Sequence, residues 1–240
     1  MANPVLTRGF HQQGPIVDDD RMTGPGVARA SFILLALFAP AAVWGWSQVS
    51  IAGAFPGWIL GAILIGLACV IVGMFKPAWA RFIAPVYAVV EGAFVGAISA
   101  TYAAAYEGIV TNAILGTIVT VAVMAVLYAT RTIRVTQRFR SVVVGATIGI
   151  FAFYLLSFGL SFFGVEMPLV WDSGVFGILF SVGVIVLAAF NLLLDFDLIE
   201  RGVKGGAPGY MNWYAAFGLL VTIVWLYLEI LRLLAKLQRR

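Results

Sequence analysis

The chain has 240 residues, of which 62% are hydrophobic and only 11% are charged. Soluble domains contain about 25% charged residues, so the composition excludes a soluble globular protein. It predicts an all-α integral membrane protein that crosses the bilayer several times. The net charge of +4 does not indicate a nucleic-acid partner, because no basic stretch carries the interleaved aromatic residues or glycines of such a module.

The first 27 residues differ in composition from the rest of the chain. They hold proline, glycine, glutamine, three consecutive aspartates and the single histidine, His11. They lack the basic-then-apolar pattern of a signal peptide. We therefore expect residues 1–27 to form a polar cytoplasmic tail and residues 28–240 to form a single transmembrane domain.

Seven stretches with few charges are long enough to cross a bilayer, which takes about 20 apolar residues. The first two share the charge-free run 30–75, and a turn is predicted between them near Phe55-Pro56-Gly57. The other predicted spans are 81–106, 108–130, 141–165, 173–194 and 213–235. Glycines four residues apart predict close helix packing; these pairs are Gly57 and Gly61, Gly92 and Gly96, and Gly145 and Gly149.

Loop charges predict the orientation. Basic residues gather in alternate loops, at Lys76, Arg81, Arg131, Arg134, Arg138, Arg140, Arg201 and Lys204, whereas the other loops carry Glu107, Glu166 and Asp172. The positive-inside rule therefore places the N-terminus in the cytoplasm. Seven spans put the basic C-terminus outside, against the rule. We still favour a true seventh span, because the stretch from Trp213 to Ala235 is long enough and contains no proline.

Acidic residues within the predicted spans are the candidate functional groups. Asp195 ends the charge-free run 173–194, and Glu229 lies inside the apolar run 217–235. A charge near the bilayer centre costs roughly 2.5–3.5 kcal/mol on insertion scales, so such acids usually face a partner or a water-filled path. Glu91 is a third membrane acid, which either lines the same cavity or, when protonated, hydrogen-bonds to a backbone carbonyl.

Two of these acids also have a structural interpretation. Asp195 could mark a helix end at the cytoplasmic interface, beside Asp197. Glu229 could form an ion pair with Arg232, three residues on and on the same helix face.

Several classes of membrane protein with a known chemistry are excluded by residue type. His11 is not at membrane depth, so a serine–histidine intramembrane protease is excluded. One histidine and one cysteine make a zinc site very unfavourable. A retinal protein needs a lysine deep in a helix, and an aspartyl intramembrane protease carries a Gly-x-Gly-Asp motif that is missing here. We therefore expect no enzymatic activity and no cofactor.

Two motifs resemble those of the Bax inhibitor-1 family, in its bacterial form. The phrase Leu192-Leu193-Leu194-Asp195-Phe196-Asp197-Leu198-Ile199 is similar to the family's aspartate-containing signature near the penultimate helix. The phrase Leu226-Tyr227-Leu228-Glu229-Ile230 is similar to its second signature, with glutamate in place of aspartate. The stretch from Tyr87 to Ser99 resembles the family's third-helix motif.

The resemblance implies a seven-helix fold with the last helix central and a pH-sensitive calcium leak. It implies that Asp195 and Glu229 form the regulating carboxylate pair, with Asp197 competing for the first position. A basic partner is also implied, for which Arg81 and Arg232 are candidates. The expected location is the bacterial inner membrane, and the expected partners are the lipid bilayer, calcium and protons.

The chemistry of a carboxylate pair agrees with this function. Two carboxylates in a low-dielectric site cannot both ionise cheaply, so the pair would share a proton and act as a latch between the last two helices. When both are ionised, Asp195 and Glu229 are candidate calcium ligands, although Ca²⁺ takes 6–8 oxygens and water or carbonyls must complete the shell. A proton-coupled transporter and a non-transporting regulator of membrane-protein quality control are the alternatives.

Overall fold

The computed structural model describes residues 21–49, 57–161 and 172–239, and the described part is almost entirely helical. Its elements in chain order are α2 (Gly24–Ser47), α3 (Trp58–Phe75), the short 3₁₀ helix η2 (Pro77–Trp79), α4 (Ala80–Ala105), α5 (Ile109–Ala129), α6 (Gln137–Ser161), α8 (Val175–Lys204) and α9 (Met211–Gln238). His11, most of the predicted first turn and Glu166 lie outside the described residues.

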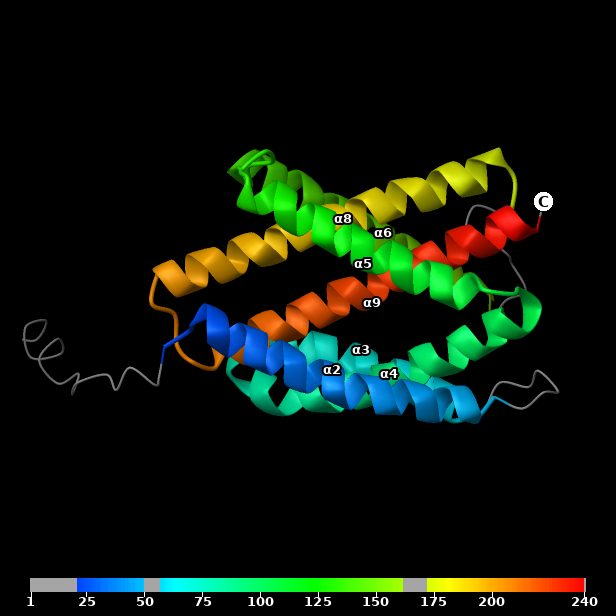
Figure 1. The fold of residues 1–240 in the computed structure, drawn as a ribbon, viewed down its shortest axis with the longest axis horizontal. Coiled ribbons are helices and arrows are strands. Elements are labelled where there is room, and N and C mark those ends of the chain that lie inside the picture. Colours follow the sequence, from blue (N-terminus) through cyan, green and yellow to red (C-terminus); the bar gives the residue numbers. More distant parts are fainter. Residues whose placement is uncertain (1–20, 50–56, 162–171, 240) are drawn as a thin grey trace, which may run out of the picture.

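The last helix, α9, is the centre of the bundle. It runs between a group formed by α5, α6 and α8 and a group formed by α2, α3 and α4 (Figure 1). It packs directly against α2, α4, α5 and α8. Its buried residues run from Ala215 to Lys236 and include Ala216, Leu220, Leu226 and Leu231. The prediction of a central last helix is confirmed.

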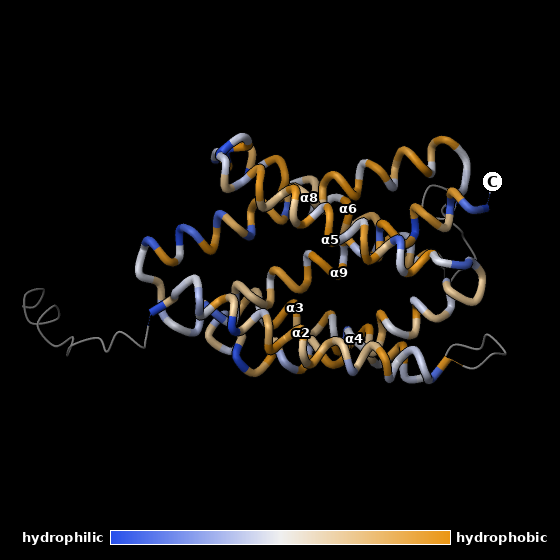
Figure 2. Tube along the Cα trace, in the orientation of Figure 1, coloured by the Kyte–Doolittle hydropathy of each residue, from blue (hydrophilic) through white to orange (hydrophobic). Residues whose placement is uncertain are grey.

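Seven helices in the described ranges are long and apolar enough to cross a membrane, one for each predicted span. Apolar residues dominate their middle portions, and hydrophilic residues gather toward the two ends of the bundle (Figure 2). Many large apolar side chains, such as Phe32, Phe82 and Val142, are exposed on the outer surface. That surface suits lipid rather than water, and the chain is a multi-pass membrane protein.

The boundaries of two predicted elements differ from the structure. The predicted sixth span ended at Leu194, but α8 continues to Lys204. Asp195 is therefore nine residues from the helix end, and Arg201 and Lys204 are helical rather than in a loop. In the same way, α6 begins at Gln137, so Arg138 and Arg140 belong to its first turn.

The end of the predicted polar tail is ordered and packs against the loop between α8 and α9. The side chain of Thr23 caps α2 by accepting a hydrogen bond from the Gly26 amide at 3.0 Å. The amide of Met22 donates to the Ala207 carbonyl at 2.7 Å, and the Met22 side chain is buried. The amide of Thr23 donates to the side-chain oxygen of Asn212 at 3.0 Å. The N-terminus of α2 is therefore fixed to the start of α9.

Only one of the three glycine pairs lies in a helix contact. Gly92 and Gly96 of α4 face the backbone of α2 so closely that a Cβ at either position would clash with a carbonyl oxygen. The reciprocal contact is made by Gly45 of α2 against the Ala93 carbonyl. The glycine pairs at 57/61 and 145/149 face open space. The packing prediction is therefore right for α4 and wrong for the other two pairs.

Candidate functional site

Glu229 lies in α9 at the centre of a polar cluster and is 1% exposed. Nη1 of Arg232 donates to its two carboxylate oxygens at 2.8 and 2.9 Å. The hydroxyl of Tyr154, from α6, donates to Oε1 at 2.8 Å and accepts a second bond from Arg232 at the same distance. Nε1 of Trp225 donates to Oε1 at 3.3 Å. The structural interpretation of Glu229 as an ion pair with Arg232 is confirmed.

Basic side chains continue along α9 beyond this cluster. Lys236 is buried and donates to the Gly177 carbonyl at 2.9 Å and to the Ser181 hydroxyl at 3.0 Å, both in the first turns of α8. Nε of Arg239 donates to the Tyr106 hydroxyl after α4 at 2.8 Å. Because these residues are three or four positions apart, they share one face of α9 and attach its last turns to three neighbouring helices.

Asp195 lies in α8 and faces α9 at a different level. Its Oδ1 lies beside Gly218, where a side chain would be in ordinary contact with it. The hydroxyl of Thr222, one turn further along α9, also faces the carboxyl group. Its Oδ2 is buried and has no hydrogen-bond partner, one of three such side-chain atoms in the described residues. A buried polar atom without a partner is costly, so this oxygen marks a position where a proton or a cation would be stabilised.

Asp197 belongs to a third cluster and points away from Asp195. It forms an ion pair with Arg140 in the first turn of α6. Nε of Arg201, one turn further along α8, lies 2.9 Å from each of its carboxylate oxygens. Asp197 thus connects the end of α8 to the start of α6.

Glu200 extends this network to α5. It accepts a hydrogen bond from the Tyr128 hydroxyl at the end of α5 and forms an ion pair with Lys204 one turn further along α8. This part of the network is exposed to solvent, so its ion pair adds little to stability.

Glu91 lies between α3 and α4 and belongs to none of these clusters. Its Oε2 is directed at Gly66 of α3, where the missing side chain leaves room for the carboxyl group. Cys69 and Tyr87 are its polar neighbours, and Tyr87 stacks edge-on against Phe217 of α9 at 5.0 Å. Glu91 therefore faces the interface between α3 and α4 and not the polar groups of α9.

The expected hydrogen bond between Glu229 and Asp195 or Asp197 is wrong for this structure. Helices α8 and α9 run antiparallel, and their register is fixed by Asp195 opposite Thr222 and by Ser181 opposite Lys236. Glu229 follows Thr222 by seven residues, which is about 10 Å along the helix axis. Asp195 of α8 and Glu229 of α9 therefore lie at different levels of this helix pair, each with its own partners.

The two candidate basic partners, Arg232 and Arg81, also lie in different parts of the structure. Arg232 pairs with Glu229, whereas Arg81 is exposed at the start of α4, stacks over the ring of Phe82 and takes part in none of the ion pairs among the described residues. No group of three or more histidine, cysteine, aspartate or glutamate side chains lies close enough in the described residues to hold a metal ion. The structure does not bring Asp195 and Glu229 together as calcium ligands.

Sequence reasoning missed several partners of these acids. Tyr154 and Arg140 are 75 and 57 residues from the acids that they contact, so no local spacing reveals them. Thr222 could have been found, because it lies one turn after Gly218 on the same face of α9. A small residue followed one turn later by a hydroxyl residue leaves room for an acid on a neighbouring helix and offers it a hydrogen bond. Lys236 is spaced one turn beyond Arg232, and this spacing could have indicated that the two side chains share one face of α9.

Comparison with known proteins identifies the family. No curated protein and no solved structure matched the chain. A family model described as Bax inhibitor 1 like matches residues 3–239, which is nearly the whole chain. With its seven membrane helices and central α9, the chain belongs to the Bax inhibitor 1 like family.

Proposed function

We propose that this protein is a pH-sensitive calcium leak channel of a bacterial inner membrane, with its N-terminus in the cytoplasm. Family membership supports the general class. The observation that carries the proposal is the buried Oδ2 of Asp195, which has no hydrogen-bond partner. An acid in this position responds to protons and to cations through the same oxygen atom.

The mechanism follows from the position of Asp195 between two packed helices. Its carboxyl group contacts α9 beside Gly218 and Thr222. A proton would let Oδ2 donate a hydrogen bond, whereas the ionised group only accepts. The preferred packing of α8 on α9 therefore differs between the two forms, and this difference is the proposed gate.

Calcium passes as cargo rather than as a resident ion in this mechanism. Ca²⁺ takes 6–8 oxygen ligands, and the Asp195 carboxylate supplies at most two. Water and backbone carbonyls supply the remainder during passage. Glu229 is already bound by Arg232 and Tyr154, so its role in this mechanism is to hold α9 against α6.

The proposal is tested by calcium flux into liposomes that contain the purified protein. We expect passive Ca²⁺ flux down its gradient, without any second solute, at a rate that changes between acidic and mildly alkaline pH. Protein-free liposomes are the control. Uphill calcium movement driven by an imposed pH gradient would indicate a proton-coupled transporter instead. No flux at any pH would overturn both and leave a regulatory protein.

A further inference from the structure

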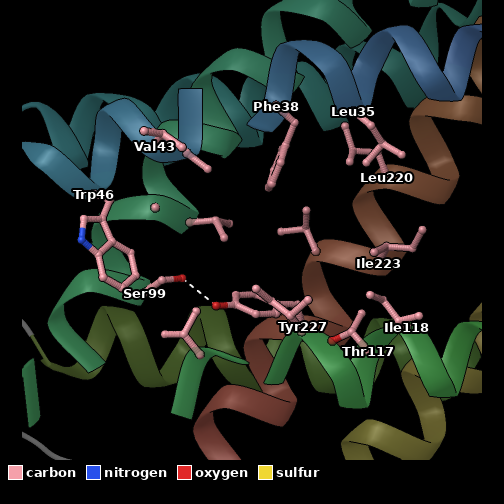
Figure 3. A pocket seen from close by; sticks show the side chains of 16 residues that line it. Leu35, Phe38, Val43, Trp46, Ser99, Thr117, Ile118, Leu220, Ile223 and Tyr227 are labelled. Atoms are coloured by element: carbon pink, nitrogen blue, oxygen red, sulfur yellow. Dashed lines mark hydrogen bonds between the residues drawn. The ribbon is translucent and has the colours of Figure 1, made fainter. Parts of the chain in front are cut away.

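A large cavity lies away from all of the acids described above. It has a volume of about 570 Å³, is lined by α2, α4, α5 and α9, and is open on one side. Its floor contains the buried side chains of Tyr227 from α9 and Ser99 from α4 (Figure 3). The buried side chain of Val224 from α9 also lines the cavity. Its mouth lies between α2 and α5, where Val43 and Ile118 are exposed.

The polar groups in this cavity already have partners. The hydroxyls of Ser99 and Tyr227 bond to each other at 2.7 Å (Figure 3). The Thr117 hydroxyl donates to the Ala113 carbonyl of its own helix at 2.7 Å. A buried water needs two to four polar partners, and apolar cavities without them stay dry. The cavity is therefore unsuited to water or to a hydrated cation, and it is not the ion path of the proposed channel.

The cavity is elongated along the helices that line it. On α2 it extends from Leu35 to Trp46, which lie at opposite ends of the view (Figure 3). Eleven residues of α helix correspond to about 16 Å, or half of a hydrocarbon core of about 30 Å. Trp46 lies next to the polar end of α2 at Ser47, and tryptophan favours the membrane interface. The cavity thus runs from one interface toward the middle of the bilayer.

We propose that this cavity binds one acyl chain of a membrane phospholipid, which enters from the bilayer between α2 and α5. The mouth residues are continuous with the lipid-facing surface of these two helices, so lipid is the medium that reaches the opening. An empty apolar space would deprive its lining of dispersion contacts on one side, and an acyl chain restores them. The inference is independent of the proposed channel function.

Photo-crosslinking tests the occupant directly. The full-length protein is placed in vesicles that contain a phospholipid with a diazirine in its acyl chain, and the adducts are mapped by mass spectrometry. We expect adducts on the buried lining residues Val224 and Tyr227 as well as on Ile148 of α6, which faces lipid. Leu192 of α8 is fully buried outside the cavity and is the negative control. Adducts on Ile148 with none on Val224 or Tyr227 would overturn the proposal.

A matched pair of variants tests the route of entry. Ile118→Trp enlarges an exposed side chain at the mouth, whereas Ile148→Trp makes the same change on an exposed face of α6 away from the cavity. We expect Ile118→Trp to lose the adducts on the two buried lining residues while keeping those on Ile148. We expect Ile148→Trp to retain the adducts on the two buried lining residues. Equal labelling of these residues in both variants would contradict entry between α2 and α5.

Discussion

The two halves of the α8–α9 pair both contain ion pairs, but the basic side chains of the two halves differ in exposure. In one half, Glu229 is 1% exposed and its partner Arg232 has a 23% exposed side chain. In the other half, Asp197 and Glu200 pair with Arg201 and Lys204, whose side chains are 55% and 66% exposed. Each is a pair of a carboxylate and a basic side chain, and burial determines what each pair contributes to stability. Removing one partner of a buried pair leaves an uncompensated charge, whereas water replaces the lost partner at the surface.

The largest expected effect comes from removing the arginine of the buried Glu229–Arg232 pair. Arg232→Met leaves the Glu229 carboxylate without its cation in the bundle interior. We expect the free energy of unfolding to fall by about 3–5 kcal/mol, measured by denaturant titration in detergent micelles. The double variant Glu229→Gln/Arg232→Met removes both charges and should recover part of this loss. A loss of less than about 1 kcal/mol for Arg232→Met would show that the pair behaves as a surface contact.

A smaller effect is expected at the other half. Asp197→Asn removes the charge that binds both Arg140 and Arg201. Hydrogen bonds to charged groups contribute about 1.5–3 kcal/mol when desolvated, and the exposure of the arginines reduces this. We expect the free energy of unfolding to fall by about 1–2 kcal/mol. A decrease as large as that of Arg232→Met would remove the distinction between the two halves.

The distance between Asp195 and Glu229 predicts that substitutions of the two acids affect stability independently. Because Asp195 and Glu229 lie about 10 Å apart along α9, the unfolding effects of Asp195→Asn and Glu229→Gln should add. Sites at this separation without shared partners are additive within about 0.3–0.5 kcal/mol. A double-mutant cycle measures the coupling energy. A coupling above about 1 kcal/mol would indicate that the two acids act as one unit.

The smallest effect is expected for Glu200→Gln. Its carboxylate is exposed and forms an ion pair with Lys204, which lies one helical turn further along the surface of α8. We expect no measurable change in the unfolding midpoint, and no change on adding salt, because exposed pairs are screened. A clear loss of stability would mean that the hydrogen bond from Tyr128 fixes α5 to α8.

The number of spans was predictable because seven apolar stretches with few charges are each long enough to cross a bilayer. The end of α8 was not, because its last turns are polar yet remain helical, with Asp197–Arg201 and Glu200–Lys204 pairs at the i, i+4 spacing. These pairs could have been recognised from the sequence. The Arg232 partner of Glu229 was anticipated from its i, i+3 spacing. The position of Glu229 relative to Asp195 depends on the register of two antiparallel helices, which spacing along the chain does not specify.

The most direct test of the central claim is calcium flux through Asp195→Asn as a function of pH. Asparagine cannot ionise, so the account predicts a flat profile at the level that the unmodified protein reaches at acidic pH. The control Glu200→Gln changes an acid on the same helix and should retain the full pH response. An Asp195→Asn protein with the unmodified pH profile would contradict the claim that this buried carboxyl group is the proton-sensitive gate.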